Sequence, residues 1–380
     1  MKRPLSSLCL ILAFGLPSAG QSVKKPKPVK LRTANLEKQE LRLGRDLRGE
    51  VPKRGFSAKI DGETYFFADL DNQPGLTPRS DGIALRGYPF LVPIPSLLLA
   101  RKGQWELDFS KNGHLLLKVP EGKKVSAKLL RGAALVNRLR FRAGVKLVAI
   151  DPAACEDCES HIDYLTVNRV TSGMGMHSEM KGRAGYTAEG AKAGQMSCLF
   201  PASPGIEDAI MNWSATPWHG VPLVDPTVAK IGVMWKNDIS MLYPLDRASV
   251  KAPFLHPASG ATRIPTSFGS RGEIPNPMPG TKNGMGCGFP VFILLPPSEQ
   301  NTRLVSATLT PVSRSGKGQK TVPGVASSPS SPANPAWPTN SGLALFLPKA
   351  PLAPKTRYRA RFEFGGSLGV VEWEFQTGKR

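Results

Sequence analysis

Proline and glycine recur throughout this chain and divide it into short segments. The 380 residues include 36 prolines and 38 glycines, so stretches long enough for an extended helix are few. Proline ends a helix and glycine weakens one, whereas both are common in the turns between strands. The sequence therefore predicts parts rich in strands and loops rather than a helical bundle. The length favours two or three domains.

The first residues have the pattern of a secretory signal peptide. Lys2 and Arg3 precede an apolar run at 8–16, and small residues follow at 18–20. That run is too short to cross a membrane, and the sequence offers no other run that could do so. We therefore predict a signal peptide at 1–20 and expect the protein to be secreted, periplasmic or located in the cell envelope.

Two segments precede the first helical pattern. Residues 21–54 are basic and lack aromatic side chains, which indicates a flexible arm with some helical tendency. Residues 55–122 contain short apolar runs between Gly, Asp and Pro, which is typical of a small β-rich module. Within it, Asp69 and Asp71 before Gly75 resemble a calcium loop. The glycine comes one place too late for such a loop, so an Asp-rich turn is the default expectation.

The central part shows helical periodicity. Residues 126–144 carry apolar side chains at helical spacing, although Arg140 also falls on the apolar side, so a strand near it stays open. Gly144 suits the end of that helix, and Pro152 suits the start of a second one that runs to about residue 168. A third helix is predicted over 206–215, followed by two antiparallel strands over 229–235 and 239–243.

Three polar residues lie in separate motifs of this part. His177 is in M-H-S-E, Glu189 is in Y-T-A-E-G-A-K-A-G, and His219 is in W-S-A-T-P-W-H-G. Any one of them alone is more typical of a surface or capping residue. Together, two imidazoles and a carboxylate could converge on a metal or on a proton-transfer site. They could also brace the fold through hydrogen bonds.

The order of these motifs resembles the bacterial branch of the CAP superfamily, which takes in cysteine-rich secretory proteins, antigen 5 and pathogenesis-related 1 proteins. The resemblance spans about 129–246 and is carried by His177-Ser178, Gly185-Tyr186, 189–194, 213–219, 223–226 and 231–233. It implies an α–β–α sandwich over residues 126–246.

The resemblance also implies a cleft that contains His177, Glu189 and His219, with Glu179 as a further candidate. Zinc or another divalent metal would bind His177, Glu189 and His219, and Glu189 would be the candidate general base. Thr216 stands nearest to the family's fourth, acidic position, and Gly220 stands where an arginine is common. The set of metal ligands is therefore incomplete.

Residues 252–380 shift in composition to Pro, Gly and Ser. Five strands are predicted, and 312–341 is predicted to be a long low-complexity loop between two of them. The closing L-x-P-x-T-x-Y and W-x-F-x-T patterns resemble those of bacterial immunoglobulin-like domains. The expected fold class is thus α+β: a small β-rich module, a CAP-type α–β–α sandwich and an all-β immunoglobulin-like sandwich. The five strands are predicted over 291–295, 304–312, 343–347, 358–364 and 370–377.

Four cysteines follow the predicted signal peptide: Cys155, Cys158, Cys198 and Cys287. An exported protein can oxidise them, so a structural disulfide, free thiols and a metal or redox role all stay open, as does the pairing. The net charge of +21 favours contact with anionic surfaces. We find no interleaving of basic and aromatic residues of the kind typical of nucleic-acid binding, so no specific nucleic-acid partner is expected.

Three functions follow from these observations. The favoured one is a non-catalytic, exported binding module for a lipid, a peptide or an anionic envelope polymer. The alternative is a metal-assisted, peptidase-like hydrolase that uses Glu189 as its base. A serine hydrolase built on Ser178 and His219 would lack the G-x-S-x-G motif. The sequence does not determine the oligomeric state.

Overall fold

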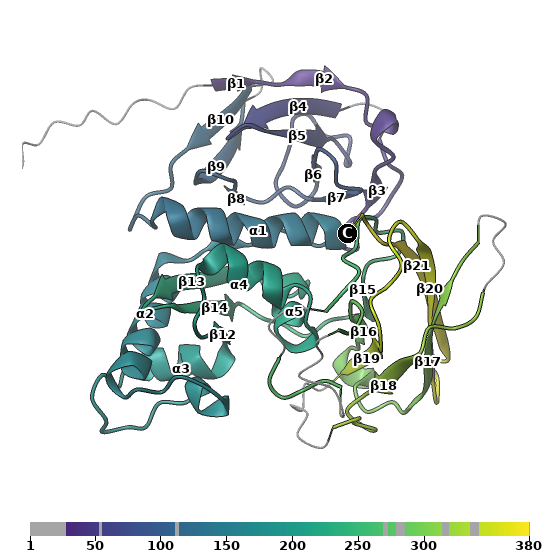
Figure 1. The fold of residues 1–380 in the computed structure, drawn as a ribbon. Coiled ribbons are helices and arrows are strands. Elements are labelled where there is room, and N and C mark those ends of the chain that lie inside the picture. Colours follow the sequence, from purple (N-terminus) through teal and green to yellow (C-terminus); the bar gives the residue numbers. More distant parts are fainter. Residues whose placement is uncertain are drawn as a thin grey trace, which may run out of the picture.

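The computed structural model describes residues 28–52, 55–110, 114–268, 273–278, 286–313, 319–334 and 342–379. The predicted signal peptide lies outside these residues. The fold is α+β, with a β-rich N-terminal part, a central part of helices around a sheet, and an all-β C-terminal part (Figure 1).

The N-terminal part consists of two sheets. One has the strand order β1-β10-β9-β8, and the other has the order β2-β4-β5-β6-β7-β3. The strands that the sequence predicts over 55–109 are confirmed as β4, β5, β6 and β9. The strands are β1 (Pro28–Lys30), β2 (Arg32–Ala34), β3 (Arg42–Leu43), β4 (Gly55–Ile60), β5 (Glu63–Ala68), β6 (Gly82–Leu85), β7 (Phe90–Pro93), β8 (Leu97–Leu99), β9 (Gln104–Phe109) and β10 (His114–Lys118).

The prediction of a flexible arm at 21–54 is wrong for the described residues 28–52. Strands β1, β2 and β3 pair with β10, β4 and β7, and the helical tendency yields only the short 3-10 helix η1 (Glu37–Gln39). Leu36 is fully buried among side chains of the second sheet. Because such short strands are stabilised by partners far away in the sequence, their local composition did not reveal them.

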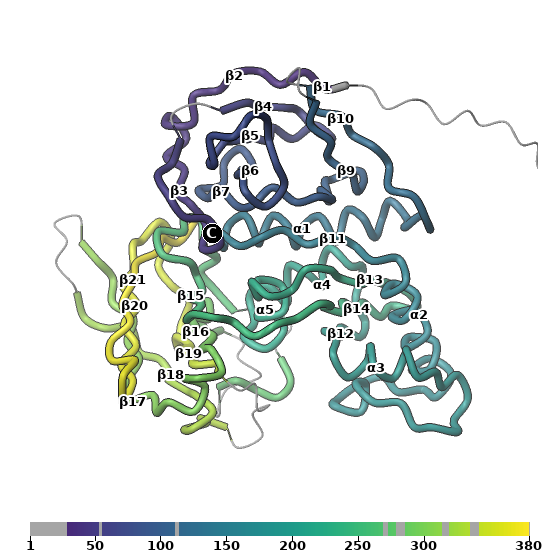
Figure 2. The backbone as a smooth tube through the Cα atoms, turned by 180° about the vertical axis from the view of Figure 1, so that it is seen from behind, coloured from purple at the N-terminus to yellow at the C-terminus, as the bar shows by residue number. Residues whose placement is uncertain are grey.

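Helix α1 (Ala127–Ala143) lies between the N-terminal sheets and the central part (Figures 1 and 2). Its ends are those predicted: the Ser126 hydroxyl accepts the Leu129 N–H, and Gly144 ends the helix with a left-handed φ of 67°. One side of α1 contacts β6, β7 and β8, and the other contacts α4, α5 and β13. This helix therefore belongs to the cores of both parts.

Arg140 is fully buried on α1, and its partners explain why a charge stands on the apolar face. Its guanidinium donates to the carbonyls of Lys146, Leu223 and Val228 at 2.6, 3.2 and 3.1 Å. Two of these carbonyls lie more than 80 residues further along the chain. Arg140 therefore ties the end of α1 to the turn that leads into the central sheet, and the strand left open at this point is replaced by helix.

The central part is a three-layer α–β–α arrangement. Its sheet has the order β11-β13-β14-β12, with α1 and α4 on one face and α2 and α3 on the other. Neighbouring residues of β14 face opposite layers, since Leu242 packs with the first group of helices and Met241 with the second. The elements are β11 (Ala149–Ile150), α2 (Pro152–Val167), η2 (Met174–His177), α3 (Ala188–Met196), β12 (Cys198–Phe200), α4 (Ile206–Trp213), α5 (Pro217–Val224), β13 (Lys230–Lys236) and β14 (Ile239–Leu245).

The C-terminal part contains two antiparallel sheets, ordered β15-β16-β19-β18 and β17-β20-β21, which share one core. The five predicted strands are confirmed as β16, β17, β19, β20 and β21. Strand β18 lies inside the loop predicted at 312–341, so that loop is wrong in part; 314–318 and 335–341 lie outside the described residues. The elements are β15 (Phe254–His256), β16 (Val291–Leu294), η3 (Pro297–Glu299), β17 (Leu304–Pro311), β18 (Gly324–Ser327), β19 (Leu343–Pro348), β20 (Arg357–Phe364) and β21 (Val370–Gln376).

Candidate functional site

A pocket of about 320 Å³ lies where the central part meets the segment that leads into the C-terminal sheets. Its walls come from η2 and the residues before it, from β12, α4 and α5, and from residues 273–274. His177 and His219, which the sequence places in separate motifs, both line it. The described lining is Ser172, Gly173, Met174, Met176, His177, Leu199, Phe200, Pro201, Asn212, Trp213, His219, Glu273 and Ile274.

His177 stands at the end of η2 with one ring nitrogen already engaged. Its Nδ1 donates to the Gly194 carbonyl at 2.9 Å, so the neutral ring carries its proton on Nδ1 and has a lone pair on Nε2. Burial is the largest cause that lowers the pKa of His177 below its ordinary value, and a protonated His219 would lower it further. The Gly194 bond opposes this shift without cancelling it. His177 is therefore neutral at physiological pH.

Gly194 is required at this place by a close approach between helices. A Cβ on this residue would lie 2.3 Å from the His161 ring, which is fully buried on α2. His161 donates from Nε2 to the Met176 carbonyl at 2.7 Å, and its Nδ1 lies 2.8 Å from the Glu179 carboxylate. The contact between His161 and Glu179 holds the loop before α3 against α2. It therefore also fixes the position of His177, which lies in the same loop.

His219 lies in the first turn of α5, after Thr216 and Pro217. Its backbone N–H and its ring Nδ1 both lie close to Glu273 Oε1, at 2.8 and 2.7 Å. The first N–H groups of a helix have no partner within the helix, and the Thr216 side chain does not cap this one. Glu273 thus fills the place of a capping residue and also orients the imidazole. The ring stacks on Trp213, with centroids 6.2 Å apart.

Glu273 is the site residue that the sequence did not reveal. It follows His219 by 54 residues, in a Gly- and Pro-rich connector between the central part and the C-terminal sheets. Its side chain is fully buried, yet its second oxygen, Oε2, has no hydrogen-bond partner among the residues that the structure describes. A buried carboxylate oxygen without a partner is costly, so this atom calls for an explanation. In the sequence, Glu273 is marked only by being an acidic residue within a stretch rich in Gly and Pro.

The two acidic residues predicted for the cleft lie elsewhere. Glu189 is exposed in the first turn of α3 and is not among the described lining residues. Glu179 has a fully buried side chain, which bonds the His161 ring and the Thr187 N–H. Thr216 is buried and donates its hydroxyl to the Trp213 carbonyl. Ser178 is exposed and is also not among the described lining residues.

A divalent metal held by His177, Glu189 and His219 does not fit these positions. A tetrahedral metal site needs ligand atoms about 2 Å from one point. Within the described ranges, the one group of three or more His, Cys, Asp or Glu side chains that lie close enough to share an ion is Asp69, Asp71 and Asp81. The exposed position of Glu189 on α3 is the reason that the predicted set is not assembled.

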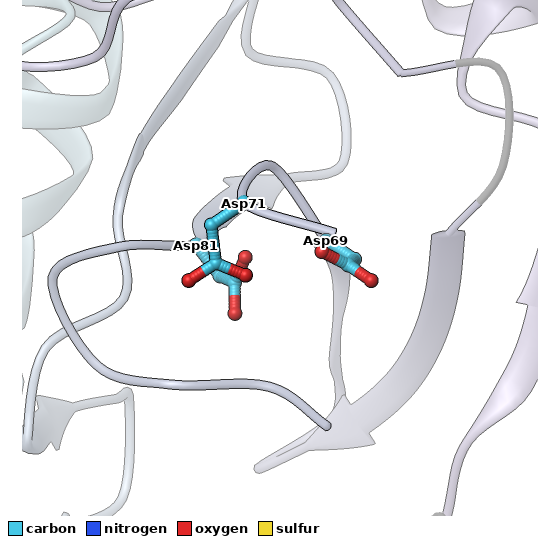
Figure 3. A group of neighbouring side chains, drawn as sticks. All are labelled: Asp69, Asp71 and Asp81. Carbon is cyan, nitrogen blue, oxygen red and sulfur yellow. The ribbon is translucent and has the colours of Figure 1, made fainter. Parts of the chain in front are cut away.

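The three aspartates lie on the turn after β5, in the N-terminal part (Figure 3). Asp81 is fully buried and accepts the N–H groups of Leu70 and Thr77, both at 2.7 Å. Asp69 accepts the Asn72 N–H at 2.8 Å and Asp71 accepts the Gln73 N–H at 3.0 Å. These carboxylates therefore organise the turn.

Cys155, Cys158 and Cys198 are free thiols, and all four cysteines of the described ranges are buried. Burial raises the pKa of Cys155 to about 11 and also raises that of Cys158 and Cys198. A thiol with a raised pKa and no solvent access is a poor nucleophile. Of the possibilities that the sequence left open, the structure shows packed, reduced side chains.

No family model matches this chain, and no curated protein matches it. Among solved structures, an extracellular protein containing a SCP domain from Bacillus anthracis str. Ames is similar with a TM-score of 0.26 and 13% identity. The match covers 51% of this chain and 67% of that one. Within the described residues, no helix has the length and apolar character needed to span a membrane.

Proposed function

We propose that this chain is an exported protein of CAP type whose central pocket binds a small amphipathic ligand. The single observation that carries this is the pocket itself, where two histidines from separate motifs face a cavity of about 320 Å³. Small-molecule sites commonly combine apolar walls with a few placed polar groups. The expectation of export rests on the sequence pattern at 1–20.

The walls are suited to a short apolar chain. Leu199, Phe200 and Trp213 are buried against the core, while Ile274 and Met174 are more than half exposed at the pocket. Exposed thioether and aliphatic side chains adapt to ligands of different shape. Of the partners expected from the sequence, this geometry supports part of a lipid or peptide better than a long envelope polymer.

The metal-assisted hydrolase has less support. Its general base was to be Glu189, which is exposed on α3, and its metal ligands are not brought together. The contact between His219 and Glu273 orients an imidazole, but the same contact caps α5 and joins the connector to the central part. Catalysis would require a general base and a metal in the pocket in addition to the two histidines, whereas binding requires neither.

The test is a series of n-alkanols from four to ten carbons, titrated by saturation-transfer NMR. Affinity should rise about fourfold per methylene while the chain fills the pocket and then level off. Ile274→Trp should block the mouth and weaken the longest alkanol at least tenfold. Val370→Trp is the control, because Val370 is similarly exposed (50% against 52%) but lies on β21. Absence of saturable binding, or equal effects of the two substitutions, would refute the proposal.

A further inference from the structure

The pocket presents hydrogen-bond acceptors from its histidines and its carboxylate. His177 donates through Nδ1 to a carbonyl, which leaves Nε2 as an acceptor. His219 approaches Glu273 Oε1 through Nδ1, which leaves its Nε2 in the same state. Neither Nε2 has a hydrogen-bond partner among the described residues. A ligand whose polar end only accepts hydrogen bonds would therefore meet acceptors at both rings.

Glu273 adds a buried carboxyl group with unused bonding capacity. Its Oε1 accepts both His219 N–H groups, and its Oε2 is buried without a partner among the described residues. The residue is 4% exposed and belongs to the pocket wall. An ionised carboxylate in such a place is stabilised most by a ligand that brings a positive charge and N–H donors.

From these observations, and resting on the proposed function, we infer that the pocket binds a primary ammonium group on a short apolar stem. An ammonium carries N–H donors and no acceptor, so it complements the Glu273 carboxylate together with one imidazole Nε2. Trp213 and Phe200 line the same cavity and offer aromatic faces that attract a cation. The stem lies along the apolar walls.

A bare divalent ion fits the acceptors of His177, His219 and Glu273 less well than an organic cation does. The acceptors of His177, His219 and Glu273 do not form a described group close enough to share one ion. An ammonium on a flexible stem needs only the carboxylate and one imidazole, while its stem fills the remaining volume. The same chemistry occurs in a free alkylamine and in a lysine side chain.

The experiment compares three probes of equal length on the unmodified protein at pH 7.5: n-hexylammonium, 1-hexanol and hexanoate. We expect hexylammonium to bind at least tenfold tighter than hexanol, and hexanoate to bind weakest. The net charge of +21 would by itself attract the anion and repel the cation. Preference for the cation must therefore come from the pocket.

Glu273→Gln keeps the shape of the side chain and removes its charge. It should weaken hexylammonium binding about tenfold to a hundredfold, so that the preference for hexylammonium over hexanol is lost. Glu189→Gln is the matched control, because it removes an exposed carboxylate outside the pocket and should change neither affinity. Nα-acetyl-lysine amide then distinguishes the sources: binding equal to hexylammonium assigns a lysine side chain, and tenfold weaker binding assigns a free amine.

The outcomes separate the two proposals. If none of the three probes binds, the proposed function itself fails. If hexanol binds as well as hexylammonium, the proposed function stands and the ammonium site is refuted, and this comparison needs no variant. A Glu273→Gln protein that folds and keeps full affinity for hexylammonium would also refute it.

Discussion

Replacing His256 with phenylalanine should remove much of this protein's sensitivity to mild acid. His256 lies on β15 and is half-buried, but its Nδ1 is buried and has no hydrogen-bond partner among the described residues. Its ring packs on three phenylalanines, with centroids 4.6 Å from Phe292, 5.7 Å from Phe289 and 6.5 Å from Phe254. Burial lowers the pKa of His256 from 6.5 to about 3, and the charge of Arg142 contributes.

The sign of the effect follows from where the proton binds. Between pH 6.5 and about 3, the unfolded chain protonates His256 and the folded chain does not, so acid favours unfolding. The stability that this residue contributes is complete above pH 6.5 and is lost progressively as the pH falls through that window. The shift predicts a loss of about 2 kcal/mol between pH 7 and pH 5.

The assay is urea unfolding of both proteins at pH 7 and pH 5. Phenylalanine preserves the stacking of the ring and cannot be protonated, so the variant should lose about 2 kcal/mol less than the parent over this range. The other histidines, His114, His161, His177 and His219, are present in both proteins, so they cancel in the difference. Identical pH dependence in the two proteins would show that His256 does not titrate as its surroundings require.

Two further predictions concern the core. Arg140→Met removes the donor that the carbonyls of Lys146, Leu223 and Val228 share. The substitution should therefore lower the free energy of unfolding by about 3 kcal/mol or more in the same urea assay. A loss below about 1 kcal/mol would mean that water replaces the guanidinium. The buried cysteines should react with an aromatic disulfide reagent at pH 8 only after unfolding; fast labelling of any of the four in the folded protein would contradict their burial.

Local signals in the sequence were sufficient for about half of the described helices and strands. Ser126 and Gly144 bound α1 as predicted, and Pro152 begins α2, because helix caps act through groups within a few residues. The alternating strands β20 and β21 were likewise predicted from their own residues. Strands β1 to β3 were missed, since each contains two or three residues and depends on a distant partner.

The candidate site divides in the same way. The sequence by itself picked out His177 and His219, because their motifs are short and continuous, and both residues line the pocket. The sequence predicted Glu189 as the carboxylate of the site, and only the tertiary structure shows that Glu273 lies beside His219 instead. The local sequence determines which residue types are neighbours along the chain. The contact between His219 and Glu273, 54 residues apart, forms only when the connector packs against α5.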